Sequence, residues 1–182
     1  KERALNTILL SLNVIFWTWV IGIPLGVIAA LNYRSTFDRI LTVLSSVGMA
    51  IPSFFFAILL LIFAQKTGWF PIGGLTCPNF SNLTFLHKIF DVAHHLFLPT
   101  LVLTTISLAG LSRQMRSNLL DVLDSDYVKF AKAKGLSPFK VVVKHALRNA
   151  INPLVTLLGF EFAALLSGAA LTEYVFQYPG LG

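Results

Sequence analysis

Long apolar stretches alternate with short polar ones along the chain. Residues 4–33 hold no charged side chain, and a second uncharged stretch covers residues 40–65. A transmembrane helix needs about 20 consecutive, mainly apolar residues, so such stretches are long enough to cross a bilayer. The pattern predicts an all-α membrane protein with spans at about residues 5–31, 40–65, 93–112 and 151–171, joined by polar loops at 66–92 and 113–150.

The loop at 113–150 contains signals for two short helices with a sharp stop between them. Asp124, Ser125 or Asp126 can cap the first helix, because a short oxygen-bearing side chain accepts from the free N–H groups of a first turn. Gly135 can end this helix, since the residue after a helix often needs a positive φ. Ser137 can then cap the second helix, with Pro138 at its first position, where no N–H donor is needed.

The first of these helices carries a small apolar stripe. Tyr127, Phe130, Ala131 and Lys134 recur at spacings of three and four, which places them on one face. The face is too small to form a core, and it is typical of a helix that fills a groove on another protein. The alternative is an ordinary basic loop that lies on the membrane surface.

Composition and charge support the membrane assignment. Hydrophobic residues make up 55% of the chain and charged residues 12%, whereas a soluble domain has about 25% charged residues. The formal net charge is +6, but the basic residues cluster in particular loops. This clustering is typical of membrane orientation, so nucleic acid is not expected as a partner.

The loop charges predict the orientation. Residues 113–148 hold eight Lys and Arg against three Asp, a net charge of +5, whereas residues 66–91 hold two Lys and one Asp, a net charge of +1. Positive loops stay in the cytoplasm, so the loop 113–150 is predicted to be cytoplasmic and the loop 66–92 external. The start of the chain, with Lys1 and Arg3, then lies outside. A basic external start is unusual for this rule, and we therefore expect the 182 residues to be a fragment of a longer chain.

No enzyme chemistry is expected from the sequence. A phosphate-binding GxxxxGK[ST] motif is absent, as are a catalytic triad and a recognisable pair of carboxylates. The single cysteine, Cys77, excludes an internal disulfide and has no evident partners for a metal site. We interpret His87, His94 and His95 as solvated or interfacial side chains, and predict no metal site and no cofactor in this chain.

The polar stretch Asp126–Pro153 resembles the "EAA" loop of permease subunits of bacterial ATP-binding-cassette importers. The runs A-K-A-K-G-L-S and H-A-L-R-N-A-x-x-P are similar to the dipeptide and oligopeptide branch of that family. Lys129 and Phe130 stand where the broader signature has Glu and Ala. The residues that match the branch are Ala131, Gly135, Leu136, Leu147, Arg148, Asn149 and Pro153.

The resemblance implies a fold and a function. The fold is a type I importer permease core (MetI-like) with four to five transmembrane helices, so that residues 1–182 form a single transmembrane permease domain of the bacterial inner membrane. The function is import of di- or oligopeptides, with nickel complexes and some sugars as other cargoes of similar permeases. The implied partners are ABC ATPase subunits that bind ATP and Mg²⁺, a second homologous permease, an extracytoplasmic solute-binding protein and the lipid bilayer.

The resemblance also implies site residues. The expected contact with the ATPase is made by Asp126, Tyr127, Lys129, Phe130, Ala131, Lys134, Gly135 and Leu136. The expected translocation path involves Pro52, Ser53 and Glu161, the last being the one acidic residue inside a predicted span. For Pro52 a packing kink is the alternative, and for Glu161 a carboxyl group bonded to a neighbouring helix. An ion- or proton-coupled secondary transporter is the alternative function, although that class usually has several ionisable residues in its spans.

Overall fold

The computed structural model describes residues 2–182, which form helices and no strand. The all-α prediction is confirmed for this range. Lys1, which the charge pattern places outside the cell, lies beyond the described residues. The chain forms two compact units, and each is described by itself. One comprises residues up to 16, 50–106 and 162–182, and the other comprises residues 17–49 and 107–161. The expectation that residues 1–182 form a single transmembrane domain stays a prediction.

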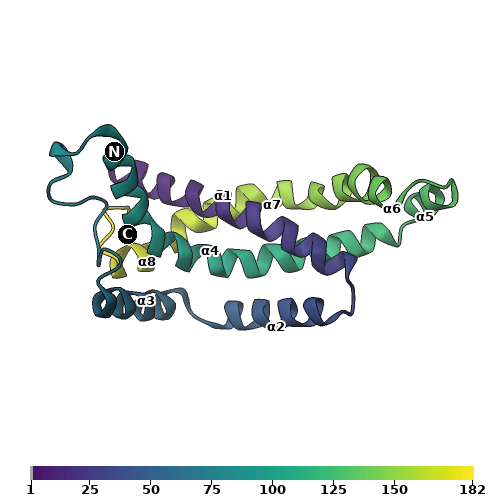
Figure 1. Cartoon of the computed structure of the whole chain (residues 1–182), viewed down its shortest axis with the longest axis horizontal. Helices are drawn as coiled ribbons and strands as arrows, with labels where there is room; N and C mark the ends of the chain where they lie inside the picture. Colours follow the sequence, from purple (N-terminus) through teal and green to yellow (C-terminus); the bar gives the residue numbers. More distant parts are fainter. Residues whose placement is uncertain (1) are drawn as a thin grey trace. The chain divides into compact units, whose positions relative to one another are not determined.

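Three helices within residues 2–182 are long and apolar enough to cross a membrane, and a broken helix pair brings the number to four. Their order is shown in Figure 1. The elements are α1 (Glu2–Leu31), α2 (Thr36–Ala50), α3 (Ser53–Thr67), η1 (Phe80–Asn82), α4 (Phe85–Leu123), α5 (Asp126–Ala133), α6 (Pro138–Lys140), the π-helical η2 (Val141–Ala146), α7 (Leu147–Gly168) and α8 (Ala170–Val175).

The predicted span 40–65 is two helices rather than one. α2 ends at Ala50 and α3 begins at Ser53, with Pro52 in an extended conformation between them. Proline disfavours the helical conformation of the residue before it and lacks the N–H that would continue the helix. Pro24, Pro99 and Pro153 lie inside helices, where no break occurs.

α4 is longer at both ends than the predicted third span. It begins at Phe85, inside the predicted external loop, and continues through Arg113 to Leu123, inside the predicted cytoplasmic loop. The sequence prediction was based on the ends of the apolar stretch, which are not the ends of the helix. A helix can continue past that point, because its backbone hydrogen bonds are satisfied whether or not the side chains are apolar.

The unit of residues 17–49 and 107–161 has its core between α1, α4, α5 and α7. Met115, Leu119 and Leu154 are fully buried there. Gly26 lies so close to α4 that a Cβ atom would come within 2.6 Å of the Ser112 carbonyl oxygen and 2.7 Å of Met115 Cβ. The absence of a side chain at this position therefore allows the two helices to approach.

In the other unit, the last residues of the chain are fastened to α1 and α8. The Glu173 carboxylate accepts a hydrogen bond from the Thr7 hydroxyl at 2.6 Å and one from the Gly182 backbone N–H at 2.8 Å. Thr7 in turn accepts from the Leu181 N–H at 2.9 Å. Glu173 is buried, so these bonds replace the water that its carboxylate would otherwise require.

Gly180→Ala is expected to loosen this C-terminal segment. The Cβ atom of an alanine would collide with the Glu173 carboxylate, and overpacking of this kind typically costs about 1–3 kcal/mol. Hydrogen exchange measured by mass spectrometry should be faster in the peptide 176–182 of the variant. Gly110→Ala is the control, because its Cβ position faces open space, with no atom within 4 Å beyond its neighbours in the same helix. Equal exchange in the parent and Gly180→Ala would contradict the assignment.

Candidate functional site: the short helix α5 and its supports

The end of α5 is a Schellman motif. Gly135 has a φ of +77°, and its N–H donates to the Lys132 carbonyl at 3.0 Å, while the Leu136 N–H donates to the Ala131 carbonyl at 3.4 Å. These two bonds satisfy carbonyls that the end of a helix leaves without partners. The predicted stop at Gly135 is confirmed, and it is what turns the chain back toward α6.

The beginning of α5 is at the predicted place but uses a different bond. Ser125 occupies the capping position in an extended conformation, yet its side chain makes no capping bond. Its hydroxyl donates instead to the Val122 carbonyl at the end of α4, at 2.5 Å. Ser125 thus stabilises the turn between α4 and α5.

α5 has an inner face and an outer face. Val128 is fully buried and Ala131 is 8% exposed, and both pack in the core that contains Leu119 and Val141. Tyr127 is 44% exposed and Phe130 65% exposed. The predicted stripe of Tyr127, Phe130, Ala131 and Lys134 is therefore divided: Ala131 anchors the helix within its own chain, and the aromatic side chains point outward.

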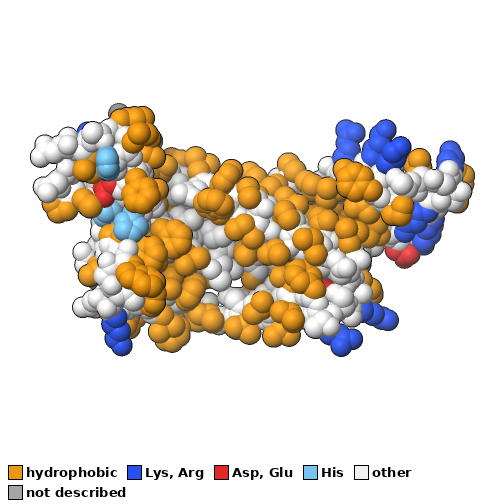
Figure 2. All heavy atoms as spheres, in the orientation of Figure 1, with side chains coloured by type: hydrophobic (Ala, Val, Ile, Leu, Met, Phe, Trp, Pro, Cys, Tyr) orange, Lys and Arg blue, Asp and Glu red, His pale blue; other side chains and the backbone are white. Residues whose placement is uncertain are grey.

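The charged residues of α5 are partly engaged with their own chain. Lys129 forms an ion pair with Asp124 at 2.9 Å. Through this hydrogen bond Lys129 lowers the pKa of Asp124 below its usual value. The Lys134 ammonium lies 5.3 Å from the centre of the Phe130 ring, a distance at which a cation is attracted to the ring face. Lys and Arg side chains surround the apolar ones over α5 and α6 (Figure 2).

The second helix begins as predicted and supports the first. Pro138 is at the first helical position, and Ser137 caps it by accepting from the Lys140 N–H at 3.5 Å. The helix then passes through η2, where Val141 is buried against α5. In α7 the Asn149 side chain donates to the Tyr127 hydroxyl at 2.8 Å, which holds Tyr127 in place while its ring stays accessible.

The residues of the predicted path lie in different units, with Pro52 and Ser53 in one and Glu161 in the other. Pro52 is exposed and Ser53 is half-buried at the start of α3. Glu161 is half-buried on α7 and accepts a hydrogen bond from the Trp19 indole N–H of α1 at 3.2 Å. A bond to a neighbouring helix was one of the two interpretations of Glu161, and the bond alone does not exclude contact with a substrate.

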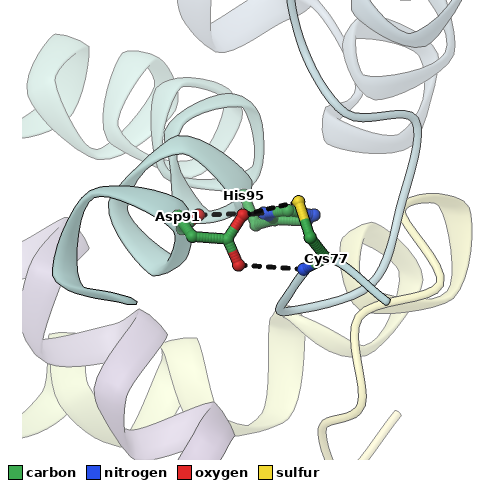
Figure 3. A group of neighbouring side chains, drawn as sticks. All are labelled: Cys77, Asp91 and His95. Atoms are coloured by element: carbon green, nitrogen blue, oxygen red, sulfur yellow. Dashed lines mark hydrogen bonds and ion pairs between the residues drawn. The ribbon is translucent and has the colours of Figure 1, made fainter. Parts of the chain in front are cut away.

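Two groups of residues were not predicted from the sequence. Cys77, expected to lack partners for a metal site, lies with Asp91 and His95 in a cluster whose candidate ligand atoms are within 4.8 Å of one another (Figure 3). Asp38, which is buried, forms an ion pair with Arg116, which is partly exposed. Of these residues, only Asp91 and His95 could have been connected from the sequence, because a spacing of four puts them on one face of a helix.

Residues 22–182 match the family described as the binding-protein-dependent transport system inner membrane component. The chain is 42% identical to the oligopeptide transport system permease protein AppB of Bacillus subtilis over 99% of its own length and 56% of the relative. It is 39% identical to the di/tripeptide transport system permease protein DppB of Pseudomonas aeruginosa over 97% of its length and 56% of the relative.

A third relative is the oligopeptide transport system permease protein OppB of Haemophilus influenzae, with 40% identity over 90% of the chain and 49% of the relative. The chain spans about half the length of these curated relatives. The family match and the long apolar helices identify a multi-pass protein of the cell membrane. The chain therefore belongs to the binding-protein-dependent transport system inner membrane component family.

Proposed function

We propose that this chain is the membrane-spanning permease subunit of an ATP-driven importer of di- or oligopeptides. ATP and Mg²⁺ bind to partner ATPase subunits, and a second homologous permease and an extracytoplasmic solute-binding protein complete the transporter. Support for the cargo comes from the relatives, whose names describe oligopeptide and di/tripeptide transport. Membership of the permease family supports the subunit's role.

The observation that carries the ATPase contact is the outer face of α5. Tyr127 and Phe130 are exposed aromatic side chains on a short helix whose other face is buried. Aromatic residues are enriched at the centres of protein interfaces, where they fill pockets on the partner. Asp126, Lys129 and Lys134 are also exposed, as is typical of the polar rim of such an interface. Leu136 is a further exposed apolar side chain.

The packing of the inner face of α5 supports a route for movement from the ATPase to the membrane. Val128 and Ala131 pack in the same core as Leu119 of α4 and Leu154 of α7. Closely packed cores transmit displacements because they have few voids to absorb them. When the ATPases close, they move α5, and the attached parts of α4 and α7 move with it. This motion drives alternation between inward-open and outward-open states.

The transport proposal is tested with the assembled transporter in proteoliposomes. Uptake of a radiolabelled dipeptide and of a longer peptide is measured with ATP on the ATPase side, with a non-hydrolysable ATP analogue, and with a proton or sodium gradient instead. ATP-dependent uptake of peptide is the expected result. Uptake driven by an ion gradient without ATP would contradict the proposal and favour a secondary transporter.

Glu161 is the proposed path residue that a conservative variant can test. Glu161→Gln keeps an oxygen that can accept from the Trp19 indole but removes the negative charge that would attract the amino terminus of a peptide. A hydrogen bond to a charged group contributes about 1.5–3 kcal/mol, so we expect uptake of peptides with a free amino terminus to fall about tenfold. Uptake of amino-acetylated peptides, relative to the parent transporter, should change little.

A matched variant separates this role from a structural one. Trp19→Phe removes the indole donor while Glu161 keeps its charge, so any change in uptake should be the same for free and acetylated peptides, relative to the parent. Equal uptake of every peptide by the parent and Glu161→Gln would remove Glu161 from the path.

A further inference from the structure

The loop before α4 brings the only cysteine of the chain against two side chains of that helix. The Cys77 thiol donates to Asp91 Oδ1 with an S···O distance of 2.7 Å, and the Cys77 backbone N–H donates to Asp91 Oδ2 at 2.8 Å. His95 lies one turn further along α4, with its Nδ1 atom 3.5 Å from Asp91 Oδ1. The three side chains converge on one point (Figure 3).

We propose that Cys77, Asp91 and His95 form a binding site for a divalent transition-metal ion of the zinc type. Thiolate sulfur, imidazole nitrogen and carboxylate oxygen are the three ligand types that zinc takes from proteins. A thiolate and a carboxylate together balance the two positive charges of the ion, so the occupied site is neutral. The proposal does not depend on the transport function.

The His95 ring is buried and is held through one of its two nitrogens. His95 is 7% exposed, and its Nδ1 lies 2.8 Å from the Asp91 backbone carbonyl. A carbonyl oxygen only accepts hydrogen bonds, so Nδ1 carries the proton and neutral imidazole has its lone pair on Nε2. Metal-binding histidines almost always donate their other ring N–H in this way, which fixes the tautomer and the ring orientation.

The carboxylate is supported in a similar manner. Asp91 is 8% exposed. If Oδ1 binds the ion, Oδ2 keeps its bond from the Cys77 backbone N–H, and such outer bonds are usual for metal-binding carboxylates. Cys77 is exposed, so its side chain can rotate to adjust the distances among the ligand atoms, which in a tetrahedral zinc site are about 3–4 Å.

A fourth ligand position has room beside the cluster. Cys77 and Asp91 line a cavity of about 350 Å³, together with His87, Phe90 and His94. A site with three protein ligands and one position open to water or another donor is a common arrangement for zinc. The cavity accommodates such a fourth ligand.

Binding of the ion has a proton balance that can be measured. The free site holds a thiol proton near neutral pH, because an ordinary cysteine has a pKa of about 8.5 and the Cys77 thiol donates this proton to Asp91. The ion forms a bond to sulfur, and the thiol proton leaves to solvent. One proton is therefore released per ion, and the affinity falls about tenfold for each pH unit below the thiol pKa.

The test uses the intact permease, purified in detergent and titrated with Zn²⁺ and with Co²⁺ as a spectroscopic probe. We expect one ion per chain, a sulfur-to-cobalt charge-transfer band in the near ultraviolet and the release of one proton. Cys77→Ser should remove the band and the proton release. Cys77→Ser, Asp91→Asn and His95→Gln should each weaken Zn²⁺ binding at least tenfold, because even changes to outer partners typically cost about 10- to 100-fold.

The control is His145→Gln, a histidine of η2 in the other unit, which should bind the ion like the parent. Size-exclusion profiles and circular dichroism show whether each variant is folded, and exposed Cys77 is the position where substitution is least disruptive. Two results would overturn the proposal. One is the absence of a charge-transfer band in the parent, and the other is Zn²⁺ binding by folded Cys77→Ser with unchanged affinity and proton release.

Discussion

Phe130→Asp is expected to reduce co-purification of the partner ATPase with this chain by at least about tenfold, which corresponds to about 1.4 kcal/mol. Phe130 is 65% exposed on α5. Burying a phenylalanine side chain in a partner pocket contributes about 1.5–3 kcal/mol. An aspartate in the same pocket would lose its water without gaining a partner. The measurement is a pull-down from native membranes, quantified against the amount of permease recovered.

The effect should arise from the interface and not from unfolding. The side chains that anchor α5 in its own chain are Val128 and Ala131, and the substitution leaves them unchanged. Aspartate has a lower helix propensity than alanine, so Phe130→Asp could also weaken α5. Phe130→Ala is therefore a second variant, which removes the ring but favours the helix. Both variants are expected to lose the ATPase.

Phe85→Asp is the matched control for Phe130→Asp. Phe85 is an exposed phenylalanine at the start of α4, in the part of the chain that the charge pattern places outside the cell. The control is expected to retain the ATPase. Retention of the ATPase by Phe130→Asp and Phe130→Ala would contradict the docking proposal. The loop would then be better explained as a basic loop on the membrane surface, which binding to anionic vesicles would show.

Loss of the ion pair between Asp38 and Arg116 is expected to have the largest effect on stability. Asp38 is 3% exposed. Its Oδ1 accepts from Arg116 Nε at 2.5 Å, and its Oδ2 accepts from Arg116 Nη2 at 2.9 Å and from the Arg34 backbone N–H at 2.9 Å. One carboxylate therefore joins α2, α4 and the turn that precedes α2.

Arg116→Ala removes two of these three hydrogen bonds. The buried carboxylate keeps only the one from the Arg34 N–H. Breaking a buried ion pair by removing one partner costs about 3–5 kcal/mol. We expect about 3 kcal/mol, the lower end, because the Arg116 side chain is partly exposed. Arg116→Lys should recover only part of the loss, because lysine cannot make the two parallel bonds of a guanidinium.

The measurement is a double-mutant cycle of Asp38→Asn and Arg116→Ala, with unfolding followed in mixed micelles. A coupling free energy of about 2 kcal/mol or more is expected, since residues in one hydrogen-bond network couple by about 0.5–3 kcal/mol. Lys129→Ala is the control, because its ion pair with Asp124 is exposed to solvent and should contribute little. Strictly additive losses in the cycle would contradict the assigned role of the pair.

The features predicted correctly from sequence depend on a few neighbouring residues. Gly135 ends α5 because a left-handed residue is needed there, and Ser137 with Pro138 begins the next helix, whatever the rest of the chain does. The apolar stretches predicted long helices for the same reason, since their length and composition are local properties. The break at Pro52 was predicted as a bend and is a complete interruption of the helix.

The features that were missed depend on where distant residues meet. Asp38 and Arg116 are 78 positions apart, and nothing in the spacing of the sequence connects them. The sequence placed Ala131 in one stripe with Tyr127 and Phe130, and only its contact with the core of its own chain showed that it faces inward.

The sequence by itself determined the helical class, the permease family and the local shape of the loop 113–150. Periodicity, helix caps and motif residues act over a few positions, so they can be read without a fold. The tertiary structure alone decided which face of α5 is free, that Asp38 pairs with Arg116, and that Cys77 meets Asp91 and His95. These outcomes depend on close packing between elements, where one side chain excludes another, and packing is a property of the folded chain.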